Sequence, residues 1–215
     1  FYGLGEKAAR LDKRRGKFVM WNTDAFKYVE GTDPLYQSIP FYLGLDEGRG
    51  YGLFFDNSHR STFEFGHLSQ EAAEYSADGG VLDYYYFHGP ALKKIVGRYT
   101  ELTGRMPLPP LWALGHHQSR YSYYPEATVE RVVREYRARD LPLDVLHLDI
   151  HYMDGYRVFT WDRARFPDPA AMHRRLAAQG VHTIAIVDPG VKQDESYSVY
   201  QEGVAQDHFL RRADG

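Results

Sequence analysis

The stretch HLDIHYMDG at residues 147–155 holds the side chains of this sequence that are best suited to chemistry. His147, Asp149 and His151 alternate with other residues, so in a β-strand all three side chains would leave the backbone on one face. Two imidazoles that flank a carboxylate could hold zinc. A carboxylate flanked by aromatic and polar groups could equally bind a sugar hydroxyl. The residue types alone leave both interpretations open.

The spacing along a strand weighs against the metal. At about 3.3 Å per residue, His147 and His151 would be about 13 Å apart in an extended strand, too far to share one ion unless the strand bends. Catalytic zinc uses three protein ligands, so the site would have to recruit His116 or another residue. A metal-dependent hydrolase built on a barrel is therefore the weaker alternative, and we expect no metal ligands here.

Aromatic residues crowd the sequence on both sides of Asp149. Carboxylates interleaved with aromatic rings suit carbohydrate, because the carboxylate accepts hydroxyl hydrogen bonds while a ring packs on the apolar face of the sugar. The same rings could also simply pack the loop 151–167, and we expect Trp161 to lie in the core. The residues concerned are Tyr121, Tyr123, Tyr124, Tyr152, Tyr156, Phe159 and Trp161.

Composition excludes several classes of protein. Aromatic residues make up 15% of the 215 residues, including 18 Tyr, and the net charge is −3. No basic stripe is present, which disfavours nucleic-acid binding, and no apolar run approaches about twenty residues, so we expect no membrane span. The absence of cysteine excludes a disulfide scaffold and is compatible with a cytoplasmic location.

The N-terminal part of the sequence has the pattern of an antiparallel β-sandwich. Short β-branched or aromatic runs are bounded by Gly, Asp and Asn turn residues, and strands at this spacing are typical of a sandwich. The segment 22–37 is the exception, because it is aperiodic and long enough to be functional or mobile. The predicted strands cover residues 16–22, 38–45, 50–57, 61–66 and 82–89.

The character of the sequence changes at residue 89. Leu92, Ile95, Val96, Tyr99 and Leu102 form one apolar helical stripe. The following MPLPP forbids regular structure for several residues. We therefore predict that the chain has three parts. They are the C-terminal part of a β-sandwich domain at 1–88, a helical linker at 89–110, and the first βα units of a barrel at 111–215.

Strands and helices alternate after the linker. Predicted strands at 111–118, 143–150 and 181–190 are separated by helices at 125–140 and 168–180. This order is typical of βαβ units and a parallel sheet. Three strands cannot close a (β/α)8 barrel, so we predict an incomplete TIM barrel whose remainder lies beyond residue 215. The chain also lacks an initiator Met, so we expect it to be part of a longer protein.

The C-terminal ends of barrel strands carry the active-site groups of such folds. Asp149 stands at such an end, and we expect Leu146, Leu148 and Ile150, on the opposite phase, to face the helices. Asp188 occupies the corresponding place on the next strand, where Pro189 and Gly190 favour a turn-forming role as strongly as a functional one. His116 and His117 are adjacent, so at most one of them can face the site.

With these residues in view, the sequence resembles the retaining α-glucosidases of glycoside hydrolase family 31. The resemblance runs through nearly the whole chain in family order, and it implies an N-terminal β-sandwich followed by a (β/α)8 catalytic barrel. The matching stretches are FYGLGEK, WNTDAF, TDPLYQSIPFYLG, PPLWALGHHQSRYSYY, LPLDVLHLDIHYMDGYRVFTWD, FPDP and TIAIVDPGV.

The resemblance also implies roles for individual residues. Asp149 matches an aspartate that binds a sugar hydroxyl in the −1 subsite, and Ile150 matches a residue that lines the same subsite. Tyr121 matches an aromatic wall of that pocket. Asp24 looks like the acidic residue that the sandwich extends into the substrate cleft. His151 takes a position that is often Asp in relatives.

No catalytic residue is expected within the chain. The family's nucleophile and its general acid/base are aspartates on later barrel strands, and the W-x-D-M-N-E type motif of the nucleophile is absent from residues 1–215. The resemblance therefore implies a part of an enzyme that cleaves terminal α-glucosidic bonds by double displacement without any cofactor. Its expected partners are an oligosaccharide or α-glucoside and the rest of its own barrel. A non-catalytic carbohydrate-binding protein on the same fold is the stronger alternative.

Overall fold

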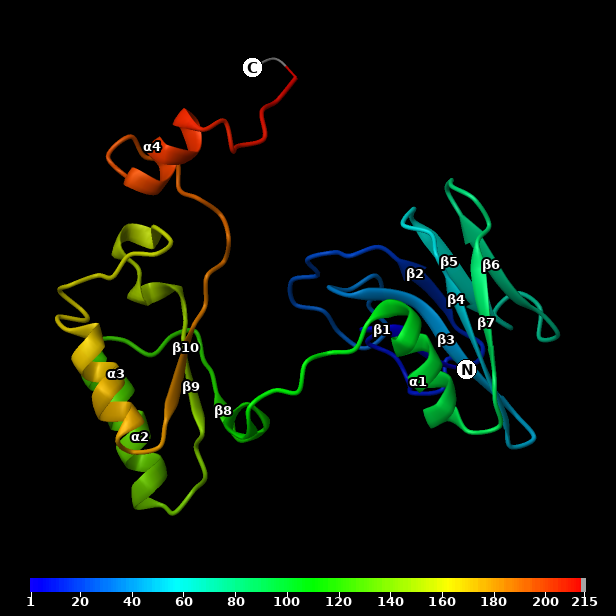
Figure 1. Cartoon of the computed structure of the whole chain (residues 1–215), viewed down its shortest axis with the longest axis horizontal. Coiled ribbons are helices and arrows are strands. Elements are labelled where there is room, and N and C mark those ends of the chain that lie inside the picture. Colours follow the sequence, from blue (N-terminus) through cyan, green and yellow to red (C-terminus); the bar gives the residue numbers. More distant parts are fainter. Residues whose placement is uncertain (214–215) are drawn as a thin grey trace. The chain divides into compact units, whose positions relative to one another are not determined.

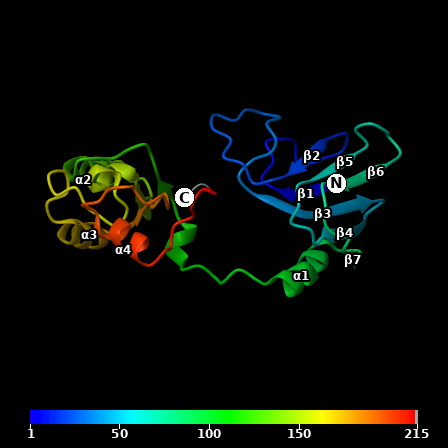
Figure 2. The same cartoon turned by 90° about the horizontal axis from the view of Figure 1, so that it is seen from above.

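The computed structural model describes residues 1–213, which divide into two units, the first ending at Met106 and the second beginning at Pro107. The first unit is built on two antiparallel sheets (Figures 1 and 2). One sheet has the order β1-β3-β4-β7 and consists of β1 (Tyr2–Gly5), β3 (Ser38–Asp46), β4 (Arg49–Phe55) and β7 (Tyr84–His88). The other has the order β2-β5-β6 and consists of β2 (Lys17–Met20), β5 (Ser61–Phe65) and β6 (Ala73–Ala77).

An aromatic core fills the space between the two sheets. Alternate residues of β5 point inward, and Phe63 and Phe65 are each only 1% exposed. Because successive strand residues face opposite sides, this alternation buries one face of the sheet. The structure thus confirms the predicted sandwich. The buried residues of this core are Leu4, Phe18, Met20, Tyr42, Phe55, Phe63 and Phe65.

Helix α1 (Leu92–Thr103) packs on the other face of the first sheet. Its Ile95 is fully buried against Phe41 and Phe87. The close approach depends on Gly52, where an added Cβ would lie 2.7 Å from Ile95 Cγ2. In the structure this helix therefore belongs to the first unit, whereas the sequence pattern assigns it to a linker.

The second unit contains a three-stranded parallel sheet in the order β10-β9-β8. Its strands are β8 (His117–Gln118), β9 (Val145–Leu148) and β10 (His182–Ala185), and its helices are α2 (Glu126–Ala138), α3 (Pro169–Ala177) and α4 (Ser198–Ala205). Helices α2 and α3 lie on the same side of the sheet (Figure 1). This is the start of a β/α barrel, as predicted, and the strands within residues 1–213 do not close a barrel.

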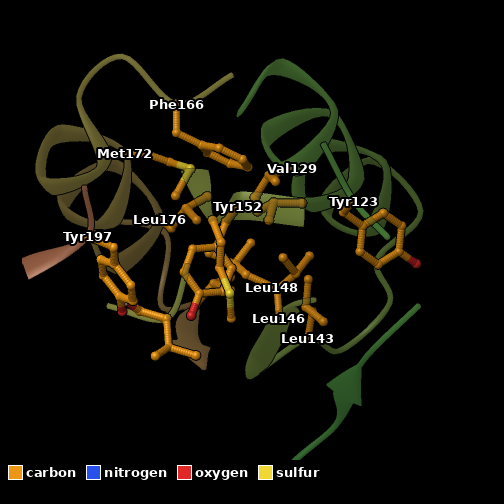
Figure 3. Close-up of a cluster of buried hydrophobic side chains, with 14 residues drawn as sticks. Tyr123, Val129, Leu143, Leu146, Leu148, Tyr152, Phe166, Met172, Leu176 and Tyr197 are labelled. Carbon is orange, nitrogen blue, oxygen red and sulfur yellow. The ribbon is translucent and has the colours of Figure 1, made fainter. Parts of the chain in front are cut away.

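The core of this unit lies between the sheet and helices α2 and α3 (Figure 3). Leu146 and Leu148 of β9 are buried there, as predicted, together with Val129 and Val133 of α2. Among residues 1–213, no helix combines the length and the hydropathy that a bilayer crossing requires.

The segment 111–118 differs from its prediction. Residues Leu111–Leu114 form a 3-10 helix, η1, and only His117–Gln118 form a strand. The short apolar run LWAL fits either state by pattern alone. The preceding Pro110 presents a carbonyl that accepts the Ala113 amide at 3.0 Å, which starts the helical turn. Strands β1 and β6 and helix α4 are additional elements that the pattern does not predict.

Candidate functional site

Asp149 follows directly after the last residue of the central strand β9. Its Oδ1 accepts a hydrogen bond from its neighbour's amide, Ile150 N, at 2.7 Å, and so caps the 3-10 helix η2 (Ile150–Tyr152). Aspartate is favoured at this position because its side chain satisfies a free amide of the first turn. The residue is half-buried, so its carboxylate is held in a fixed place at the C-terminal end of β9.

The prediction that His147, Asp149 and His151 share one strand face is wrong for His151. Strand β9 ends at Leu148, and His151 lies in η2, where the two-residue alternation no longer applies. The two histidines consequently have different partners. His147 Nε2 lies 3.1 Å from His117 Nδ1, and His151 Nδ1 lies 2.5 Å from Ser122 Oγ.

The His117–His147 pair joins strands β8 and β9. Burial, and then the charge of His117, lower the pKa of His147, which favours its neutral form. His117 Nε2 also lies 3.2 Å from Ala113 O. His116 points elsewhere, toward the Tyr136 hydroxyl at 3.4 Å, so the two adjacent histidines face opposite sides as predicted. Within residues 1–213, no three His, Asp or Glu side chains gather as metal ligands would.

His151 lies at the centre of an aromatic cluster. Its ring stacks on Tyr124 with a centroid distance of 4.8 Å and an interplanar angle of 8°. The rings of Tyr121 and Tyr156 meet it edge-on at 4.9 Å and 5.7 Å. Tyr121 is 72% exposed and Tyr156 is 55% exposed, so both rings are accessible. We call Tyr121, Ser122, Tyr124, His151 and Tyr156 the His151 cluster.

Arg165 supports this cluster from the loop that precedes α3. Its guanidinium lies 4.7 Å from the Tyr124 ring centroid, a cation–π contact, and its Nη1 donates to His151 O at 3.2 Å. Its Nε lies 3.2 Å from Asp162 Oδ2. Neither Ser122 nor Arg165 is predicted from the sequence. The position of Ser122 among three tyrosines in the sequence was the one indication that it belongs to the site. The sequence around Arg165 gives no such indication.

The remaining aromatic residues of this region divide into buried and exposed ones. Tyr123 and Tyr152 are buried in the core, and Trp161 packs against it, as predicted. The Tyr152 hydroxyl donates to Ile186 O at 2.9 Å, and burial raises its pKa. Phe159 is 72% exposed.

The loops that follow β9 and β10 are tied together. Arg157 forms an ion pair with Asp194, and Lys192 Nζ donates to Gly155 O at 2.8 Å. Hydrogen bonds from Ser196, and then the Arg157 guanidinium, lower the pKa of Asp194 to about 2. Asp188 is exposed, and its carbonyl accepts the Gly190 amide at 2.7 Å.

Asp24 lies in the first unit, in the segment 22–37 that joins β2 to β3. It is exposed, together with Phe26 and Tyr28 nearby. Desolvation, and then the Asp24 carboxylate, raise the pKa of Tyr36. The segment therefore presents a carboxylate among exposed aromatic rings.

A carboxylate at the C-terminal end of the central strand lies where barrel enzymes place their active-site groups. The model of the "Glycosyl hydrolases family 31 TIM-barrel domain" matches residues 106–215. The model of the "Glycosyl hydrolase 31 N-terminal galactose mutarotase-like domain" matches residues 1–64. The chain belongs to glycoside hydrolase family 31.

Curated relatives and solved structures agree with this assignment. Alpha-glucosidase 2 of Bacillus thermoamyloliquefaciens is 50% identical over the whole chain, which covers 27% of that protein. Alpha-xylosidase XylQ of Lactiplantibacillus pentosus is 32% identical over the whole chain, which covers 28% of it. A family 31 dextranase mutant of Flavobacterium johnsoniae, complexed with isomaltotriose, has a TM-score of 0.86 and 34% identity over 96% of this chain and 25% of its own. The chain thus spans about a quarter of the length of these relatives.

Proposed function

We propose that the protein carrying this chain hydrolyses terminal α-glucosidic bonds with retention of anomeric configuration. The observation that supports it best is that a family 31 chain holds the Asp149 carboxylate at the end of β9, two residues before His151 and its accessible aromatic neighbours. A retaining glycosidase uses two carboxyl groups about 5–5.5 Å apart, one that attacks and one that transfers the proton. Carboxyl groups perform both steps, so the proposed reaction needs neither metal nor organic cofactor.

In this proposal the chain contributes binding groups. The Asp149 carboxylate accepts a hydrogen bond from a hydroxyl of the sugar in the −1 subsite, and Ile150 lines that subsite. The hydrogen bond from the Ile150 amide orients the Asp149 carboxylate and leaves the other lone pairs of the carboxylate available for the sugar. Tyr121 forms an aromatic wall, and Asp24 contacts substrate from the segment 22–37. The nucleophile and the general acid/base are assigned to residues after 215 in the remainder of the barrel.

His151 takes a defined role in the same proposal. If the Ser122 hydroxyl donates to His151 Nδ1, the proton of the neutral imidazole resides on Nε2, which then becomes a donor for a sugar oxygen. The rings of Tyr121 and Tyr156 stand edge-on to the imidazole. Ser122 thereby orients the imidazole of a substrate-binding residue.

Replacing Ser122 by Ala tests this role. We expect KM for an α-glucoside to rise about 2- to 10-fold, the effect of losing one hydrogen bond, with kcat little changed. Ser122→Thr keeps the hydroxyl and should restore KM. Ser119→Ala removes an exposed hydroxyl of the same loop and serves as the control. An unchanged KM in Ser122→Ala would contradict the role of the Ser122–His151 bond.

Glucosides are the proposed substrate class in preference to xylosides. The support is the higher identity to an alpha-glucosidase, 50%, than to an alpha-xylosidase, 32%. The test compares 4-nitrophenyl α-glucoside with the α-xyloside as substrates of the full-length gene product, and we expect the larger kcat/KM for the glucoside. Sugar binding without hydrolysis of either compound would contradict the proposal and favour a non-catalytic carbohydrate-binding protein.

A further inference from the structure

The segment 22–37 is held to the sandwich by a buried ion pair. Lys7 Nζ lies 2.7 Å from Asp33 Oδ1, and the Lys7 side chain is only 1% exposed, against 15% for Asp33. The backbone of Val19 closes the arrangement. Its carbonyl accepts from Lys7 Nζ at 2.6 Å, and its amide donates to Asp33 Oδ2 at 2.5 Å. Both charges are therefore paired and hydrogen-bonded, with the ammonium group buried and the carboxylate largely so.

The neighbours of Lys7 form two further backbone hydrogen bonds with the segment 22–37. The Glu6 amide donates to Gln37 O at 2.9 Å, and the Gly31 amide donates to Ala8 O at 2.5 Å. Residues 6–8 thus contact the segment near its middle and at its end. These hydrogen bonds and the ion pair oppose local opening of the segment 22–37. We call this segment the arm.

The rigid half of the arm is bonded to the half that carries Asp24. The Thr23 amide donates to Leu35 O at 2.8 Å, and Leu35 is only 4% exposed. The Tyr36 hydroxyl donates to Ala25 O at 3.1 Å. The two neighbours of Asp24 in the chain, Thr23 and Ala25, are therefore hydrogen-bonded to Leu35 and Tyr36.

We infer that Lys7 and Asp33 are positioning residues that fix the segment 22–37 and thereby the place of Asp24. The inference rests on the proposed function, in which Asp24 contacts the substrate. Neither residue touches the substrate. They act because a displaced arm would carry the Asp24 carboxylate away from the sugar and weaken binding of the ground state and the transition state alike, which raises KM while kcat is retained.

The test uses the double variant Lys7→Met/Asp33→Asn in the full-length gene product. Removing both charges together leaves no single buried charge behind, so the fold is preserved better than in either single variant. We expect the amides of Thr23 and Gly31 to exchange with solvent about tenfold faster or more, because the arm opens locally. We also expect KM for an α-glucoside to rise severalfold with kcat retained, whereas partial unfolding would lower kcat and leave KM unchanged.

Two controls separate this inference from the proposed function. Lys17→Met/Glu64→Gln removes another ion pair of the sandwich, 2.8 Å long between β2 and β5, and should leave exchange in the segment unchanged. Asp24→Asn tests the substrate contact itself. If Asp24→Asn raises KM and the Lys7/Asp33 variant alters neither exchange nor KM, the inference is overturned and the proposed function stands. If Asp24→Asn leaves KM unchanged, the assigned role of Asp24 fails, and the inference about its positioning fails with it.

Discussion

Replacing Asp149 by Asn in the full-length gene product is expected to lower kcat/KM for an α-glucoside by roughly 10- to 100-fold, the loss of a hydrogen bond to a charged group. The change removes the charge and turns one of the two oxygens into an amide donor. The sugar hydroxyl then loses its charged acceptor at the end of β9. Steady-state kinetics on 4-nitrophenyl α-glucoside measures the effect directly.

Asp168→Asn is the matched control for this prediction. Asp168 Oδ1 caps helix α3 by accepting from the Ala171 amide at 2.9 Å, much as Asp149 Oδ1 caps η2. Asparagine is as good a cap as aspartate, so neither variant should lose much stability. We expect Asp168→Asn to retain its kcat/KM. Equal activities of the two variants would reject the substrate role of Asp149.

Phe166→Ala is expected to destabilise the second unit by about 3–5 kcal/mol, the usual cost of removing a large buried ring. Phe166 is fully buried, and Figure 3 shows it between Met172 of α3 and Val129 of α2. Its ring also meets Trp161 at 5.6 Å. Loss of the ring would leave a cavity where the loop after β9 joins the core, and chemical denaturation monitored by tryptophan fluorescence would report the change.

Phe159→Ala provides the comparison, because it removes the same ring from a position that is 72% exposed in the same loop. Surface substitutions of this kind usually change stability by less than about 0.5 kcal/mol. We expect the denaturation midpoint of Phe159→Ala to match that of the unmodified protein. A comparable loss of stability in both variants would show that burial of Phe166 does not anchor the loop.

Periodic segments could be predicted well from the sequence. The helix predicted at 125–140 forms as Glu126–Ala138, and the helix predicted at 168–180 forms as Pro169–Ala177. In both helices an apolar stripe faces the sheet, so the pattern reflects the burial that stabilises the helix. All five predicted sandwich strands form. In β2 and β5 buried and more exposed residues alternate with period two, whereas β7 buries only Phe87.

Other elements lack such a signal. Strand β6 (Ala73–Ala77) has mostly exposed residues, so its sequence AEYSA carries no hydrophobic alternation. The strand predicted at 143–150 stops at Leu148 because the Asp149 side chain caps a helical turn, a local hydrogen bond that overrides the strand pattern. His151 therefore leaves the strand face that the spacing predicts.

The candidate site was predictable only in part. Asp149 and Tyr121 could be named from strand position and from the family resemblance. The partners that hold His151 and the segment of Asp24 could not, because each pair joins distant parts of the chain. Ser122 meets His151 across 29 positions, and Lys7 meets Asp33 across 26. Such pairs depend on how the elements pack, which neither periodicity nor motif spacing encodes.

We propose that this chain forms part of a retaining α-glucosidase, and proton NMR of the reaction products tests this most directly. The full-length gene product is mixed with 4-nitrophenyl α-glucoside, and the first glucose released is observed before its anomers equilibrate. The proposal predicts α-glucose as the initial product, because two inversions at the anomeric carbon restore its configuration. Initial release of β-glucose, or no release at all, would contradict it.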